Sequence, residues 1–269
     1  MSNIVDLGKY TTFGIGPKVK AEIVTDLSSL VKNSSAIILG RGSNVLILNK
    51  IDRKAVINRA EKFVISKDVL YAESGCSLSF LAKHTASCGL GGLEWAYALP
   101  ASVGGAIRMN AGAFFHDISE SIIKVGVLRG GEVIELGADE CGFSYRSSAF
   151  LPCDVILYAY FRLEKSSADR CNEKISQVFT LRSAQPKGKS AGCIYKTKGK
   201  SAGYYIEKAN LKGKRIGDIF VSPIHAGFFI NAGKGKCEDV VRLMDYVEKS
   251  VQDKEGVTLE KEIKIIGEI

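Results

Sequence analysis

The sequence predicts an α+β fold, and three observations support this prediction. Strand-length segments rich in β-branched residues recur through the first 165 residues. Two later segments, 165–185 and 237–253, carry the start, stop and periodicity signals of helices. The composition changes after Glu164, which places a domain boundary near 165–185. With 269 residues, the chain is long enough for two or three subdomains.

The first part of the chain is predicted to consist mainly of strands. Short strands are expected in 21–25, 36–40, 45–48 and 55–58, and hairpins in 62–74 and 124–136, the latter turning at Gly130-Gly131. The segment 77–89 has Leu78, Leu81 and Thr85 at helical spacing and a glycine stop. The segment 155–163 alternates too little for an exposed sheet, so we expect a strand buried on both faces.

The second part begins with the predicted helix 165–185, which must end before Pro186. A stretch rich in lysine and glycine follows, then two short strands in 216–222 and 226–231 and a terminal strand in 258–266. Between them, the helix 237–253 has one apolar face, formed by Val240, Val241, Leu243, Met244, Val247 and Val251.

Composition limits the classes of function. The chain starts without signal-peptide features, and its most apolar stretches are too short to span a bilayer, so we expect a cytoplasmic protein without a membrane partner. The 7 Cys form no C-x-x-C pair and the 3 His are widely spaced, so no metal site is predicted. The net charge of +8 is locally dense between 187 and 215, without interleaved aromatics. This pattern favours small polyanions over nucleic acid.

Two stretches of small residues suggest close approach of a ligand to the backbone. In "LGRGSNVLI" (39–47), the glycines allow a turn whose N–H groups face an anion, and Ser43 and Asn44 add donors. It lacks the third glycine and the helix of the Rossmann fingerprint. The stretch "LPASVGGAIRMNAGAF" (99–114) is similarly poor in bulk. Either stretch alone is more often an ordinary loop, but the pair favours a dinucleotide ligand.

Three residue types could carry chemistry. Arg146 in "FSYRSSAF" is a candidate carboxylate clamp, although such an arginine is usually a surface residue. Cys193 in "KSAGCIYK" lies among small residues and lysines. On the terminal strand, Glu260 and Glu262 share one face, and either both face solvent or one reaches into a cleft.

In order along the chain, these segments resemble one family, the UDP-N-acetylenolpyruvoylglucosamine reductases (MurB), flavoenzymes of peptidoglycan precursor synthesis and cell wall biogenesis. The resemblance rests on the following ordered set: "TTFGIG", "LGRGSNVLI", "GLEWAYALPASVGGAIRMNAGAF", "FSYRSSAF", "QPKGKSAGCIYK", "AGYYIEKANLKGKRIGD", "HAGFFIN" and "LEKEIKIIGE". The short last third is similar to the family type that lacks a large insertion.

The resemblance implies a fold with two FAD-binding subdomains of the vanillyl-alcohol-oxidase-like (PCMH) type and an α+β substrate-binding domain. The expected bounds are 1–58 with the terminal strand 263–269, then 59–165, then 166–262 for the linking helix and the substrate domain. FAD is expected to contact Gly40, Arg41, Gly42, Ser43, Asn44, Val45, Ala101, Ser102, Gly104, Gly105, Asn110, Ala111, Gly112 and Ala113.

The implied reaction uses NADPH as co-substrate and reduces the enolpyruvyl ether of UDP-N-acetylglucosamine to UDP-N-acetylmuramate. Hydride passes through FAD to C3, and C2 receives a proton. The resemblance assigns charge stabilisation to Arg146, polarisation of the carboxylate to a protonated Glu262, and the proton to Cys193, where most members have serine. Tyr145, Tyr195, Lys196, Lys212 and His225 are expected to bind the nucleotide-sugar, and the enzyme is expected to be a monomer.

Several alternatives remain at this stage. Lys189 and Lys196 could leave Cys193 as a thiolate, or Cys193 could be a spectator with water as the donor. Thr197 follows the lysine where the family usually has Asn-Pro, and Ala101 replaces a usual glycine. The rival functions are a flavin oxidoreductase of the same fold with another substrate, a family member with impaired turnover, and a nucleotide-binding or nucleic-acid-binding protein without chemistry.

Overall fold

The computed structural model describes residues 3–197 and 199–269, which form two compact units. The first unit contains residues 21–41 and 55–184, and the second contains residues 3–20, 42–54 and 185–269. The chain therefore changes unit within β2 (Lys18–Val24), between Arg41 and Gly42, after Lys54 and after Ala184. Each unit has its own hydrophobic core.

The first unit is built on two sheets. One is antiparallel with strand order β12-β11-β13-β7-β6, from β6 (Phe63–Ser66), β7 (Val69–Glu73), β11 (Ile122–Arg129), β12 (Glu132–Gly137) and β13 (Val155–Arg162). The other has the order β1-β2-β5-β3, with β3 (Ile37–Leu39) and β5 (Ala55–Asn58), and β2, β5 and β3 run parallel; its strand β1 (Asn3–Asp6) is assigned to the second unit. The strand predicted for 155–163 is confirmed as the central β13.

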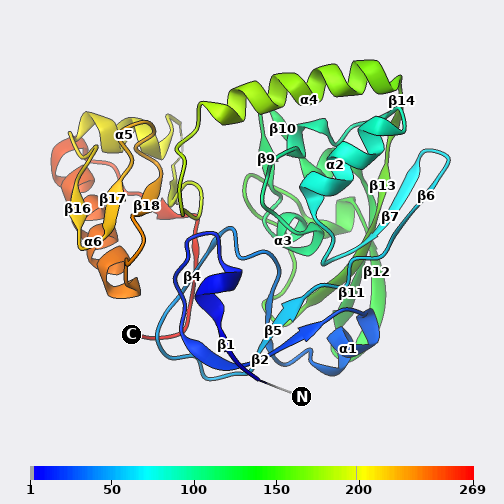
Figure 1. The fold of residues 1–269 in the computed structure, drawn as a ribbon, viewed down its shortest axis with the longest axis horizontal. Coiled ribbons are helices and arrows are strands. Elements are labelled where there is room, and N and C mark those ends of the chain that lie inside the picture. Colours follow the sequence, from blue (N-terminus) through cyan, green and yellow to red (C-terminus); the bar gives the residue numbers. More distant parts are fainter. Residues whose placement is uncertain (1–2, 198) are drawn as a thin grey trace. The chain divides into compact units, whose positions relative to one another are not determined.

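Helices cover one face of the antiparallel sheet (Figure 1). They are α2 (Leu78–Ser87) and α3 (Val103–Arg108), and α4 (Ala168–Ser183) lies against α2, while α1 (Leu27–Lys32) follows β2. Ser77 and Ser167 cap α2 and α4 by accepting backbone N–H groups, which confirms the predicted helix starts. Apolar side chains of α2, α3 and the sheet make the core of this unit.

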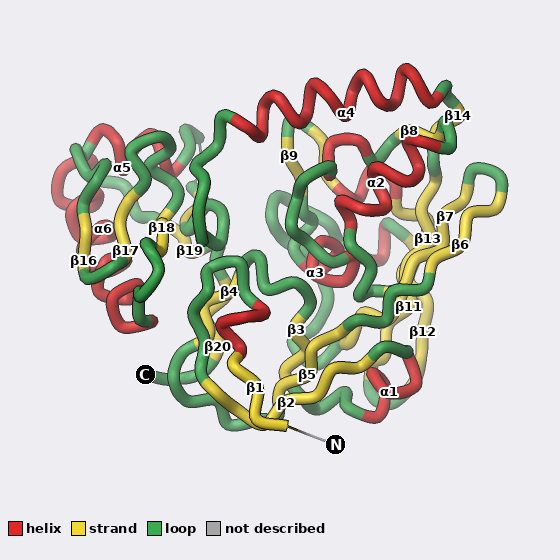
Figure 2. The backbone as a smooth tube through the Cα atoms, in the orientation of Figure 1, coloured by secondary structure: helices red, strands yellow, loops and turns green. Residues whose placement is uncertain are grey.

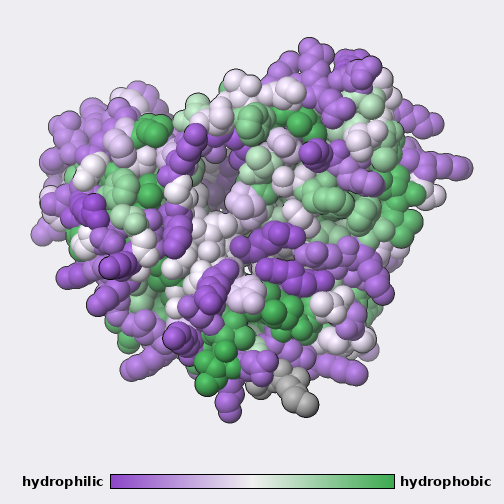
Figure 3. Space-filling view, in the orientation of Figure 1, coloured by the Kyte–Doolittle hydropathy of each residue, from purple (hydrophilic) through white to green (hydrophobic). Residues whose placement is uncertain are grey.

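The remaining elements of the first unit are short. They comprise the strands β8 (Leu90–Gly91), β9 (Gly112–Ala113), β10 (His116–Asp117) and β14 (Glu164–Lys165), and the 3-10 turns η2 (Glu94–Ala96), η3 (Ile118–Ser121) and η4 (Asp139–Cys141). Hydrophilic residues gather over the part of α4 next to β14 (Figure 3), Phe179 and Leu181 are exposed apolar residues further along, and the inner side buries Cys171, Ile175 and Val178. This amphipathic pattern is that of a surface helix.

In the second unit, α6 (Cys237–Glu255) packs beside the sheet β16-β17-β18 (Figure 2). The other elements are η1 (Leu7–Tyr10), β4 (Val45–Ile47), β15 (Tyr195–Lys196), α5 (Ala202–Lys208), β16 (Arg215–Ile216), β17 (Ile219–Val221), β18 (Phe229–Asn231), β19 (Glu260–Lys261) and β20 (Lys264–Ile266). The predicted apolar face of α6 is confirmed, because Val240, Leu243, Met244, Val247 and Val251 are buried and Val241 packs half-buried against the same core.

Three predicted elements differ in detail. The segment 216–222 was expected to be one strand but belongs to the hairpin β16–β17, because Gly217 adopts φ +54° and turns the chain. The stretch 99–114 was expected to be a loop but contains α3, which begins at the cap Ser102. The terminal strand is interrupted, since β19 pairs with β15 and β20 pairs with β4. Among the described residues, no helix is long and apolar enough to cross a membrane.

Candidate functional site

The two small-residue stretches meet in the first unit. A Cβ on Gly40 would lie 2.2 Å from Oγ of Ser102, so the turn after β3 contacts the start of α3. Ser102 Oγ accepts the N–H of Gly105 at 3.3 Å, and a Cβ on Gly104 would lie 2.8 Å from Cβ of Ser74. Gly40 and Ser102, far apart in sequence, thus approach each other without bulky side chains, as a cradle for a phosphorylated ligand requires.

Arg41 lies beside this contact. Its Nη2 is 3.0 Å from Oε1 of Glu61, and the Gly40 carbonyl accepts Nη1 of Arg59 at 2.9 Å. The Nε atom of Arg41 is buried and has no hydrogen-bond partner among the described residues. A buried donor without a partner is costly, so this atom marks a place where a ligand oxygen fits.

The rest of the turn belongs to the second unit. Gly42 is buried at φ +60°, where a Cβ would lie 2.2 Å from the carbonyl oxygen of Tyr10. Asn44 donates from Nδ2 to the Glu262 carbonyl at 3.2 Å, and its own carbonyl accepts the N–H of Lys264 at 3.0 Å. The turn predicted to bind a cofactor therefore also fixes the main chain of Glu262, next to the β4–β20 pair that begins at Val45.

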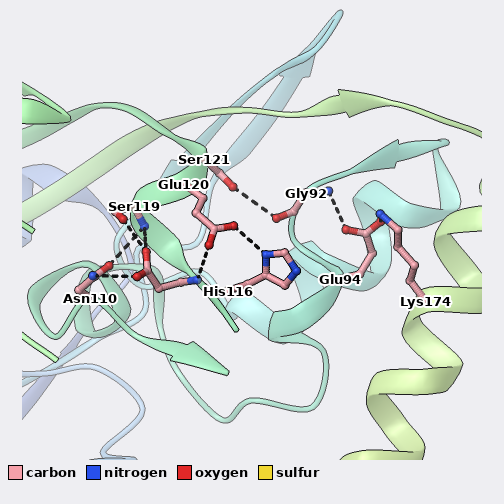
Figure 4. Close-up of polar contacts among 9 residues, drawn as sticks. Gly92, Glu94, Asn110, His116, Ser119, Glu120, Ser121 and Lys174 are labelled. Carbon is pink, nitrogen blue, oxygen red and sulfur yellow. Dashed lines mark hydrogen bonds and ion pairs between the residues drawn. The ribbon is translucent and has the colours of Figure 1, made fainter. Parts of the chain in front are cut away.

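Asn110 organises the loop after α3 in the first unit (Figure 4). Its amide nitrogen donates to Oδ2 of Asp117 at 3.2 Å and to the Ser144 carbonyl at 3.1 Å, and its Oδ1 accepts the N–H of Ser119 at 3.3 Å. His116 and Glu120 add an exposed contact of 2.8 Å. Both amide hydrogens of Asn110 are thus already used, so a contact with a cofactor would come from its main chain.

The network around Asn110 holds Arg146. Ser144 and Ser147 exchange N–H···O bonds of 3.0 Å, which leaves Tyr145 and Arg146 as a two-residue turn with Arg146 at φ +54°. Nη2 of Arg146 donates to the Gly112 carbonyl at 2.8 Å, and its guanidinium lies 5.2 Å from the ring centre of the exposed Tyr145. A non-glycine residue at positive φ costs on the order of 1 kcal/mol, and such strain is typical of functional sites.

Arg182, near the end of α4, was missed in the sequence. Its guanidinium lies 5.1 Å from the ring centre of Phe114 and donates to the Trp95 carbonyl at 3.2 Å. Burial lowers the pKa of Arg182, and its Nε has no partner within the described part of the chain. Phe114 and Phe115 form the tip of the β9–β10 hairpin, both at positive φ. Nothing in local sequence marks a helical arginine as desolvated, so only packing could reveal it.

Cys193 lies in the second unit. It forms an antiparallel bridge with Phe228, and the next residue, Ile194, donates its N–H to the Gly227 carbonyl and accepts the N–H of Glu262, at 2.9 Å each. Cys193 is half-buried, as is Glu262. The predicted proton donor and the predicted glutamate are therefore carried by segments that are hydrogen-bonded to each other.

The predicted substrate-binding residues differ in exposure. Tyr195 is buried, donates to the Met244 carbonyl at 3.1 Å, and has its pKa raised strongly by burial. Its side chain stabilises the core, so only its main chain is available for a substrate. Lys196 pairs with Glu260 at 2.8 Å and Lys212 with Glu207 at 2.6 Å, whereas His225 is exposed. Ala101 does not adopt positive φ, so its methyl group is tolerated.

These features define an α+β protein with two chemical elements. The first unit has small-residue segments and three guanidiniums, those of Arg41, Arg146 and Arg182, suited to a phosphorylated or carboxylated ligand. The second unit has a thiol and a carboxylate on adjoining segments, suited to proton transfer.

Comparison with known proteins agrees with this class. Residues 185–266 match the family model described as UDP-N-acetylenolpyruvoylglucosamine reductase, C-terminal domain. The chain is 37% identical over 280 residues to the UDP-N-acetylenolpyruvoylglucosamine reductase of Rubrobacter xylanophilus, covering 97% of this chain and 94% of that one. It is 38% identical to that of Caldicellulosiruptor bescii, covering 97% and 89%. The crystal structure of the Thermus caldophilus reductase superposes with a TM-score of 0.89 at 30% identity, covering 99% of both chains.

The chain belongs to the UDP-N-acetylenolpyruvoylglucosamine reductase family, and the predicted class of enzyme, an oxidoreductase, is confirmed. The predicted fold class is confirmed by the same structural match.

Proposed function

We propose that this protein reduces the enolpyruvyl ether of UDP-N-acetylglucosamine to UDP-N-acetylmuramate in the cytoplasm, with FAD as cofactor and NADPH as hydride source. The observation that carries the proposal is the contact between Gly40 and Ser102, which joins the two small-residue stretches in a chain similar to these reductases over almost its full length. A rival without chemistry has no need of this cradle together with Arg146, Cys193 and Glu262.

The residues present fit FAD. Gly40 and Gly42 leave no room for a side chain, and the orphaned Nε of Arg41 lies at the same turn. Backbone groups of 40–45, 101–105 and 110–113 would hold the phosphates and the ring system. When bound there, FAD would supply the hydride-transfer chemistry between NADPH and C3 of the substrate. Charge stabilisation and proton donation would come from side chains of the protein.

Arg146 would stabilise the negative charge that develops on the substrate carboxylate. One Nη of Arg146 donates to the Gly112 carbonyl, which fixes the side chain, and a planar guanidinium is the group best suited to binding a carboxylate. Because the turn 144–147 is fixed by Asn110, the guanidinium is oriented before the substrate binds. Arg182 lies beside Phe114 at the tip of the β9–β10 hairpin, and it would add positive potential for an anionic group of the substrate or of NADPH.

Cys193 would donate the proton to C2. A free thiol has a pKa of about 8.5, so it is a much stronger acid than a serine hydroxyl and is protonated at neutral pH. Glu262 would polarise the carboxylate in its protonated form, held by the Asn44–Glu262 and Ile194–Glu262 main-chain bonds. The bond to C2 forms as the S–H bond breaks, and the resulting thiolate recovers a proton before the next turnover.

The proposal is tested by incubating the purified protein with NADPH and the enolpyruvyl substrate and following product mass. We expect a product two hydrogens heavier than the substrate, and one NADPH oxidised for each product molecule formed. Arg146→Ala should lower the rate of substrate reduction at least about 100-fold while NADPH still reduces the flavin. Flavin reduction without product would contradict the proposed substrate. A colourless protein would contradict the proposed cofactor.

A further inference from the structure

Cys193 and His225 lie on the same side of Gly227. A Cβ built on Gly227 would be 3.2 Å from Sγ of Cys193, 3.0 Å from Cε1 of His225 and 3.1 Å from its Nδ1. The thiol and the imidazole are therefore at most about twice that distance apart. All three residues belong to the second unit, so their placement is defined within one compact body.

The main chain fixes this arrangement. Phe228 donates to the His225 carbonyl at 3.0 Å, and Ile194 donates to the Gly227 carbonyl at 2.9 Å. The His225 ring packs edge-on against Phe228, with ring centres 5.1 Å apart. On its other side, a Cβ on Gly203 of α5 would lie 3.0 Å from Cε1. Because Gly203 and Gly227 have no side chains, there is room for the imidazole between them.

The hydrogen bonding of His225 restricts its protonation. Nδ1 lies 3.1 Å from the N–H of Gly227 and accepts it. An imidazolium donates from both nitrogens, so it cannot accept this bond. Retaining the bond requires a neutral ring that carries its hydrogen on Nε2, a tautomer assigned from the hydrogen bond itself.

We propose that the Gly227 amide holds His225 neutral and that this neutral imidazole keeps Cys193 as a thiol, so that His225 is a positioning residue for the proton donor. An imidazolium beside a cysteine stabilises the thiolate, which is the form that a nucleophile needs and a general acid must avoid. The inference rests on the proposed role of Cys193 and extends it. A neutral His225 beside a thiol also differs from the imidazolium–thiolate ion pair of cysteine nucleophiles.

Other charged groups lie on the segments that surround the thiol. Lys196 pairs with Glu260, Glu207 with Lys212, Lys208 with Glu255, and Lys200 contacts the ring and hydroxyl of Tyr204. Lys189 and Glu262 complete the set on the elements around the thiol. All of these groups stay unchanged in the variants below, so they contribute equally to each measurement.

The test measures alkylation of individual cysteines by iodoacetamide between pH 6 and 10, with peptides resolved by mass spectrometry. Only thiolates react, so the pH midpoint of each cysteine reports its ionisation. The exposed Cys88 and Cys153 are internal controls in the same tube. In the unmodified chain we expect Cys193 to react slowly at pH 7, with a midpoint at or above about 8.5.

Two variants separate charge from packing. His225→Asn replaces Nδ1 by a neutral oxygen acceptor, and we expect the Cys193 midpoint to stay within about 0.3 pH units of the unmodified value, well inside the shift expected from a charge. His225→Lys places a permanent cation at the same site. We expect it to lower the midpoint by about one unit and to raise alkylation at pH 7 about tenfold. Neither variant should change the profiles of Cys88 and Cys153.

Each other outcome overturns the proposal. A midpoint below pH 7 in the unmodified chain would show a thiolate, and an unchanged midpoint in His225→Lys would show that the thiol does not sense this position. Equal shifts in both variants would assign the effect to packing. Because alkylation needs neither NADPH nor substrate, these results are independent of the proposed reaction.

A second measurement covers variants that fail to fold. In the unmodified chain with ¹⁵N-labelled histidine, we expect His225 at pH 7 to show a protonated Nε2 and a bare Nδ1. An imidazolium signal for His225 would contradict the proposal.

Discussion

The contact between Gly40 and Ser102 makes a quantitative prediction about the proposed cofactor cradle. In Gly40→Ala, the new methyl group would lie 2.2 Å from Ser102 Oγ, closer than any real contact. Ser102 must therefore rotate and release the Gly105 N–H that it caps. Overpacking costs about 1–3 kcal/mol and loss of a helix cap about 1 kcal/mol, so we expect a loss of about 2–3 kcal/mol in the free energy of unfolding.

A double-mutant cycle isolates this contact. Ser102→Gly removes both atoms that the new methyl meets, and glycine is a tolerated cap, so it alone should cost only a few tenths of a kcal/mol. The double variant should recover about 1–2 kcal/mol relative to the sum of the single variants. Gly137→Ala is the matched control, because its methyl would meet only Oε2 of Glu140, at 3.4 Å.

Stability is measured by urea unfolding, and flavin binding is measured separately as the FAD that the protein retains after gel filtration. Gly40→Ala should lose both stability and flavin, and the double variant should regain stability. Additive effects in the cycle would refute the contact, and full flavin retention in Gly40→Ala would refute its role in the cradle.

Three further predictions follow from the packing. Arg182→Gln should raise the KM for NADPH or for the substrate about tenfold and make that KM less dependent on salt concentration. The exposed Arg170→Gln on the same helix is the control and should leave KM unchanged. Equal kinetics in the two variants would assign Arg182 a structural role. Asp154→Asn should cost about 3 kcal/mol, because the buried carboxylate pairs with Arg129 at 2.7 Å; thermal unfolding tests this. Burial raises the pKa of Cys76 and of Tyr71 to about 12. The free energy of unfolding that these two neutral groups contribute is therefore complete below about pH 9 and should be lost as the pH rises towards 12. Denaturant midpoints that stay constant between pH 8 and 11 would contradict it.

Local signals in the sequence predicted elements whose stability is local. The helix 77–89 has its own cap and glycine stop, and the hairpin at Gly130-Gly131 has its own turn residues, and both are confirmed. The strand expected in 216–222 was wrong because a single glycine reversed the chain. The helix α3 was hidden because glycines at 104 and 105 lower helix propensity, while the Ser102 cap and tertiary packing decide the outcome.

In the candidate site, too, the sequence predicted local features but not the tertiary contacts between them. Sequence pattern selected Gly40 and Ser102, but only the fold shows that they touch. It selected Asn110 for a cofactor and Tyr195 for a substrate, although their side-chain donors are used within the protein. The surroundings of Arg182 depend on tertiary contacts, which no spacing along the chain encodes.

The most direct test of the proposed reaction is an anaerobic half-reaction followed at the flavin absorbance near 450 nm. The protein is reduced with NADPH and then mixed with enolpyruvyl-UDP-N-acetylglucosamine. We expect rapid return of the band in the unmodified chain, substantial return in Cys193→Ser, and slow return in Cys193→Ala, with equal reduction by NADPH in all three. Bleaching without return in the unmodified chain would contradict the proposed substrate, and equal return in Cys193→Ala would contradict Cys193 as the proton donor.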